Sequence, residues 1–174
     1  MRRKPWSQAA KLVFATLATL SVLPATSAHA QESDKELVTA LRAEHIPLAK
    51  GIEAAAASGK PISAKYEYEH GKLQLSVYTA KAGEYFEIIV DHRTGKVSTV
   101  KKITEGEDLE KAKVQSAAAT KAKASLASAI AKAITANKGY AVVSATAALK
   151  GERPVAEITL LKGTAFRKVS ESLE

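Results

Sequence analysis

The segment from Ile62 to Ile103, ISAKYEYEHGKLQLSVYTAKAGEYFEIIVDHRTGKVSTVKKI, decides the fold that this sequence predicts. At its start, apolar and polar side chains alternate over Ile62–Glu69, which is typical of a half-buried β-strand. Two further apolar strands are expected, at Leu73–Tyr78 and Tyr85–Val90. The last stretch, Lys96–Ile103, is polar and rich in lysine, as edge strands often are. We therefore expect an antiparallel sheet in which each strand pairs with the next.

Turn residues separate these strands at the required places. His70-Gly71 suits a tight hairpin turn, because glycine adopts a positive φ at little cost. A looser connection is expected at Ala80–Gly83. At Asp91–Gly95, the aspartate can accept backbone hydrogen bonds and the glycine can take the left-handed position. The aspartate is thus explained by the turn and is not interpreted as catalytic.

Helical patterns precede the sheet. Pro47 can begin a short alanine-rich helix in which Leu48 and Ile52 share one face. Gly59 is placed to end this helix. Small side chains allow close approach, so we expect this helix to cover one face of the sheet.

A second unit is expected after the boundary at Glu105–Asp108. One long helix is predicted from Leu109 to about Asn137, with its buried part starting near Leu126, and residues 116–123 are expected to be either an exposed extension or a loose linker. Three strands should follow, over Tyr140–Leu149, Val155–Leu161 and Ala165–Val169.

The order of helix and strands is thus repeated at an offset of roughly eighty residues, which suggests a duplication. The predicted fold class is α+β, with two small repeats, each a helix packed on an antiparallel sheet of three to four strands. The expected units are residues 31–104 and 105–174.

Composition excludes several classes of protein. The 174 residues contain no cysteine, so disulfides, thiolate metal sites and a cysteine nucleophile are absent. The formal net charge is +8, but four basic residues lie in the first thirty, which contain no acid; the remaining 22 basic and 18 acidic residues leave +4. So mild a balance does not predict a nucleic-acid partner.

The first thirty residues have the pattern of a signal peptide. Three basic residues at positions 2–4 are followed by an apolar run at Leu12–Leu23, shorter than the roughly 20 residues that a membrane-spanning helix needs. Ala28 and Ala30 provide the small side chains of a cleavage site. We expect cleavage after Ala30, which leaves an exported chain without a membrane span that is periplasmic or secreted. The alternative is an uncleaved anchor.

The motif YFEIIVDHRTGKV, together with the preceding helix and tyrosine-rich strand, resembles the PepSY domain family. Its Asp91, Thr94 and Gly95 match the ending of that family's pattern, and the likeness covers about 55 residues of the first unit. The second unit lacks this turn. The resemblance implies a small α+β domain, often in tandem, at the cell envelope or outside the cytoplasm. It also implies a role in binding or restraining peptidases.

No catalytic motif stands out from the sequence. His70 and His92 occupy turns of one predicted sheet, so they are weak candidates for a metal or haem site. No cofactor is expected. Tyr78 lies on the polar side of its strand and is the best candidate for an exposed contact residue.

The preferred hypothesis is a non-enzymatic exported binding module of the PepSY type, acting on an envelope or secreted protein that could be a peptidase. The alternative hypothesis is a metal- or haem-responsive periplasmic protein. An enzyme is the third hypothesis.

Overall fold

The structure, a computed structural model, describes residues 34–43 and 45–174 of the chain. The expected signal peptide and its cleavage after Ala30 lie outside these residues. Within them, no helix combines the length and apolarity needed to cross a bilayer.

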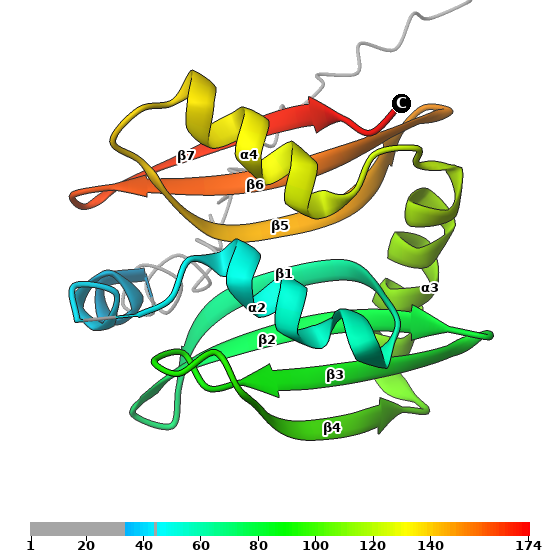
Figure 1. Cartoon of the computed structure of the whole chain (residues 1–174), viewed down its shortest axis with the longest axis horizontal. Helices are drawn as coiled ribbons and strands as arrows, with labels where there is room; N and C mark the ends of the chain where they lie inside the picture. Colours follow the sequence, from blue (N-terminus) through cyan, green and yellow to red (C-terminus); the bar gives the residue numbers. More distant parts are fainter. Residues whose placement is uncertain (1–33, 44) are drawn as a thin grey trace, which may run out of the picture.

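Seven antiparallel strands form one sheet in the order β4-β3-β2-β1-β5-β6-β7 (Figure 1). Their bounds are β1 Lys60–Glu69, β2 Lys72–Lys81, β3 Glu84–Val90, β4 Val97–Ile103, β5 Ala141–Lys150, β6 Arg153–Lys162 and β7 Ala165–Ser172. The α+β class and the antiparallel strands are therefore confirmed. Each predicted strand is present, with ends that differ by a few residues.

The two groups of strands, β1–β4 and β5–β7, join through β1 and β5. Only three residue pairs connect these strands: Ser63 with Thr146, Ala64 with Ala145, and Lys65 with Ser144. Ala64 and Ala145 are both fully buried. The prediction of separate three- and four-stranded sheets did not include this joint, since strand pairing over such a distance leaves no local mark in the sequence.

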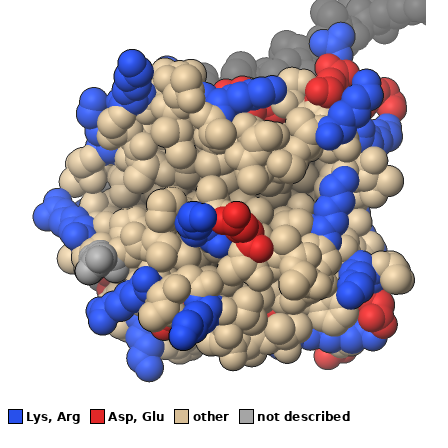
Figure 2. All heavy atoms as spheres, viewed as in Figure 1, with Lys and Arg blue, Asp and Glu red and all other residues tan. Residues whose placement is uncertain are grey.

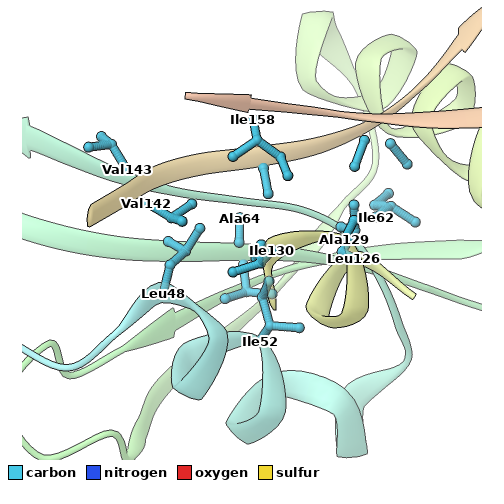
Figure 3. Packing of buried hydrophobic residues seen from close by; sticks show 14 of the residues in the cluster. Leu48, Ile52, Ile62, Ala64, Leu126, Ala129, Ile130, Val142, Val143 and Ile158 are labelled. Carbon is cyan, nitrogen blue, oxygen red and sulfur yellow. The ribbon is translucent and has the colours of Figure 1, made fainter. Parts of the chain in front are cut away.

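Two helices cover one face of the sheet. These are α2 at Leu48–Ala55, which a short 3₁₀ turn at Ala56–Ser58 extends, and α4 at Leu126–Ala136. The helices contact each other as well as the central strands. Figure 3 shows Leu48 and Ile52 of α2 approaching Ile130 of α4 over the central strands. A further short helix, over residues 34–40, precedes α2.

Helix α3, at Gly106–Lys121, contacts β1, β2, β5 and β6 and passes behind the sheet in the view of Figure 1. It buries only alanines, at positions 112, 118 and 119. The prediction that residues 116–123 are exposed or loose is therefore wrong, since Ala118 and Ala119 are buried in a regular helix.

The single long helix predicted from Leu109 to Asn137 is also wrong, because the chain leaves helical geometry between Lys121 and Leu126. Two backbone groups of this break, the N–H of Lys123 and that of Ala124, donate to the carbonyl oxygen of Leu173 at 2.8 and 3.0 Å. Ser125 then caps α4 by accepting from the N–H of Ser128 at 3.1 Å. Alanine propensity favours a continuous helix, but tertiary hydrogen bonds to the distant C-terminal segment override it.

The turns follow the predicted chemistry. His70 and Gly71 have φ values of 50° and 76°, as a hairpin with two left-handed residues requires. The Oδ1 atom of Asp91 accepts from the backbone N–H groups of Arg93 and Thr94 at 3.0 and 2.7 Å and from the Thr94 hydroxyl at 2.9 Å. Strand β4 is an exposed edge, as expected.

Candidate binding groove

Two apolar hollows flank the contact between α2 and α4, and we refer to them together as the groove. Ala49 of α2 contributes to the lining of both hollows and separates them. We call them the Leu173 hollow and the Tyr140 hollow, after one lining residue of each.

The Leu173 hollow has a volume of about 420 Å³. It is formed by the C-terminal half of α2, the first turn of α4 and the break between α3 and α4. Seven alanines, Ala124 among them, line this hollow, together with the larger side chains of Ile52, Pro61, Leu126 and Leu173.

The C-terminal segment forms part of this wall. Leu173 is 1% exposed, and its N–H donates to the carbonyl of Pro154 at 3.0 Å. Its own carbonyl holds the helix break, as described above. Lys60 donates from Nζ to the carbonyl of Ala119 at the end of α3. The break, the tail and the first strand thus fix the position of α4 beside α2.

The Tyr140 hollow, at the other end of the groove, has a volume of about 270 Å³. The N-terminal end of α2 and the C-terminal half of α4 form it, together with the start of β5. The lining includes Leu48, Ile130, Ile134, Tyr140 and Val142, with His45 at its side. Ile134 is 41% exposed, so apolar surface remains open to solvent here.

The face that carries the groove is poor in charge. Figure 2 shows most charged side chains near the outline of this face, with a broad uncharged surface between them that one basic and one acidic group interrupt near the centre. On α2, Lys50 and Glu53 form an ion pair at 2.9 Å. The hydrogen bond between them, together with their opposite charges, raises the pKa of Lys50 and lowers that of Glu53, and both side chains are exposed.

This arrangement can bind apolar side chains. Burial of apolar surface stabilises a complex by about 25 cal/mol per Å², before the entropy that association costs. Alanine-lined hollows between helices accept side chains from a partner without rearrangement of a close-packed core.

Tyr78 is half-buried on the opposite sheet face, whereas an exposed position was predicted. Its hydroxyl donates to Oε1 of Glu87 at 3.1 Å, and the Nζ of Lys65 lies 5.5 Å from its ring centroid. Burial, chiefly, and the neighbouring carboxylates raise the pKa of Tyr78 well above its ordinary value. Burial likewise raises the pKa of Glu67, which pairs with Lys65. These contacts occupy the Tyr78 hydroxyl, and its role as a contact residue stays a prediction.

The three histidines of the described residues lie apart in the chain. His70 is in the β1–β2 turn and His92 in the β3–β4 turn, where its carbonyl accepts from the N–H of Ile46 at 2.7 Å. The His45 ring packs edge-on against Tyr66, with centroids 5.3 Å apart. Over the ranges 34–43 and 45–174, no group of three or more His, Cys, Asp or Glu side chains is arranged to hold a metal ion. The metal hypothesis therefore rests on the sequence alone.

Sequence reasoning missed the groove. Its residues were assigned to the core of two separate units, whereas the groove exists only because β1 and β5 place the two helices side by side. One local mark was available: Ser125 before Leu126 is a typical helix start, and it marks the first turn of α4.

Comparison with known proteins gives little further information. No protein-family model matches the chain. No curated protein matches it. One solved structure with a partial likeness is a "putative lipoprotein" from Clostridium difficile 630, which is 14% identical, with a TM-score of 0.44 over 77% of this chain and 91% of that chain. So low a score carries no argument, and the PepSY resemblance stays a prediction.

Proposed function

We propose that this protein is a non-enzymatic exported binding module whose site is the groove between α2 and α4. The single observation that carries the proposal is the pair of apolar hollows on a face with few charges. A contiguous apolar surface on a soluble protein commonly marks an interaction site. Its partner in this proposal is an apolar segment of an envelope or secreted protein.

A polypeptide suits this surface better than a lipid chain does. The hollows are separate, because Ala49 lies between them, and both open to solvent along the groove. A polypeptide can place one side chain in each hollow and cross the rise between them. An acyl chain needs a continuous, enclosed apolar channel to bury its surface.

The proposal includes a duplication of a PepSY-like unit, which three observations support. Strands β1 and β5, at Lys60–Glu69 and Ala141–Lys150, are displaced by 81 residues at both ends. Strands β2 and β6, at Lys72–Lys81 and Arg153–Lys162, show the same displacement. The register also shifts at equivalent places, between Pro61 and Ser63 in β1 and between Val142 and Ser144 in β5.

The two hollows correspond in the same way. The two helices align in sequence: Leu48, Ala49 and Ile52 of α2 match Leu126, Ala127 and Ile130 of α4. In this proposal the helices are related by an approximate two-fold axis. The Leu173 hollow takes Ile52 from the first helix and Leu126 from the second, and the Tyr140 hollow takes Leu48 and Ile130. In this proposal one ancestral half-site, present twice, forms the groove.

Export to the periplasm or the medium follows in this proposal from the N-terminal sequence, and a peptidase as partner follows from the PepSY resemblance. These two parts of the proposal, export and the peptidase partner, rest on sequence patterns.

The experiment compares two lysine substitutions in pull-downs from an envelope extract of the source cells. Ala49→Lys places a charge between the hollows, whereas Ala136→Lys places the same charge on an exposed position of α4 that lies outside both linings and on the opposite side of the helix from Ala127. We expect a protein, identified by mass spectrometry, that wild type and Ala136→Lys retain and Ala49→Lys loses. Equal recovery with all three chains, each shown to be folded by circular dichroism, would contradict the proposal.

A further inference from the structure

Two basic side chains lie near Tyr140, which lines the Tyr140 hollow. The Nζ of Lys162 lies 5.6 Å from the Tyr140 ring centroid, and the guanidinium carbon of Arg167 lies 6.0 Å from it. Lys162 comes from the end of β6 and Arg167 from β7, so two strands direct cations to one aromatic ring at the C-terminal end of α4. The end of a helix that carries free carbonyl groups favours positive charge nearby.

Among the residues that the structure describes, no carboxylate pairs with either cation, Lys162 or Arg167. Contacts over an aromatic ring position a cation but leave its charge uncompensated.

The charged side chains of the Leu173 hollow are differently placed. Glu53 pairs with Lys50, and Lys60 is held by the carbonyl of Ala119. The two ends of the groove thus differ in charge although their apolar linings correspond. An apolar partner that carries negative charge at one end would be bound in one direction only.

We infer that the groove binds an apolar polypeptide segment with a carboxylate-bearing end, and that Lys162 and Arg167 hold this acidic end at the Tyr140 hollow. The inference rests on the proposed function and adds to it the charge and direction of the partner. An acidic side chain or a C-terminal carboxylate supplies the same chemistry. Charges at the rim of an interface mainly set partner choice and encounter rate.

The experiment measures binding of fluorescein-labelled synthetic peptides by fluorescence anisotropy. One probe has alternating leucine and serine residues and ends in a run of aspartates; a second ends in lysines. A parallel measurement adds dodecanoate and asks whether a fatty acid, which also carries a carboxylate, displaces the labelled peptide or binds when the peptide does not. The chains are wild type, Lys162→Ala/Arg167→Ala, and the control Lys101→Ala/Lys168→Ala, which has the same net charge change. Lys168 follows Arg167 in β7 and therefore points to the opposite sheet face.

We expect wild type and the control to bind the aspartate peptide roughly tenfold more tightly than the lysine peptide. The Lys162→Ala/Arg167→Ala chain should lose this preference. An unchanged preference in that chain, or an equal loss in the control, would overturn the inference. So would binding of dodecanoate in the absence of any peptide binding.

Failure of the inference is distinguishable from failure of the proposed function. If both peptides bind equally and Ala49→Lys abolishes binding of both, the groove is the site but its charge does not select the partner. If Ala49→Lys leaves peptide binding unchanged, the groove is not the binding site, and the proposed function fails with it.

Discussion

Two glycines, Gly59 and Gly139, stand just before β1 and β5, the two strands of the central joint, and their surroundings differ. Both have positive φ, at 146° and 82°. A Cβ on Gly59 would lie 2.8 Å from the backbone carbonyl oxygen of Ala80, whereas one on Gly139 would meet only the end of the Lys162 side chain at 3.6 Å. Backbone atoms cannot give way as a flexible side chain can.

Alanine at these two positions should therefore have unequal effects. Gly139→Ala should cost about 1 kcal/mol, which is the strain of a left-handed alanine. Gly59→Ala should cost about 3 kcal/mol, because strain and a backbone clash add. Urea denaturation of both variants measures the difference in the free energy of unfolding. Equal costs would show that the chain before β1 is free to move away from β2.

Asp91 is a residue whose role the sequence predicted correctly, since an aspartate before a glycine turn acts through its immediate neighbours. Hydrogen bonds to Thr94, chiefly, and to Arg93 lower the pKa of the Asp91 carboxyl below its ordinary value of 3.8. The carboxylate therefore favours the folded state above that value, and its contribution is lost as the pH falls through the lowered pKa.

Asp91→Asn should flatten the pH dependence of stability at acid pH, since asparagine does not titrate there. As the pH falls from 5 towards 2, wild type should lose more of its free energy of unfolding than the variant, because only wild type has a stabilising carboxylate to protonate. Denaturant titrations at several pH values measure this. Parallel curves for the two proteins would contradict the role of the charged carboxyl.

At the scale of elements, the break between α3 and α4 depends on Leu173. This side chain is 1% exposed and lines the Leu173 hollow, and its backbone makes the hydrogen bonds that replace the missing helical ones. The helices α2 and α4 were largely predictable, because their apolar spacing is local. For the break, the sequence offers only Ser125 as a local helix start, because the hydrogen-bond acceptor lies some fifty residues along the chain from Lys123.

Leu173→Ala should destabilise the fold by about 3 kcal/mol, the usual cost of removing a buried leucine side chain. Leu149→Ala is the matched control: Leu149 is 36% exposed, and its loss should cost about 1 kcal/mol or less. Thermal and urea unfolding compare the two. A small effect of Leu173→Ala would mean that packing of this side chain does not anchor the tail beside the helix break.

At the scale of the molecule, the sheet unites two groups of strands through the short pairing of β1 with β5. Ala64 and Ala145 are both 0% exposed and pair with each other at the centre of this joint. Alternating patterns predicted each hairpin correctly. They could not predict this joint, since two alanines opposite each other carry no sign of which strand they will meet.

The joint and the shared helices should make unfolding cooperative across the whole described chain. Hydrogen exchange followed by mass spectrometry tests this with Leu173→Ala, a change that directly follows β7. The most protected amides of β2 and of β6 should lose protection by the same factor, because both exchange through global unfolding. Loss confined to β6 and β7 would show two independently unfolding units.

The most direct test of the groove is site-specific photocrosslinking in the source cells, with a photoreactive phenylalanine at one of three positions: Ala127 or Lys132 on α4, or Val100 on β4. Ala127 lines the Leu173 hollow, whereas Lys132 is exposed on another side of the same helix and lines neither hollow. If the groove is the binding site, the position-127 chain will form a crosslinked product with another protein and the position-132 chain will not. The same product from both positions on α4, or a product only from Val100 on the exposed edge strand β4, would contradict the groove as the site.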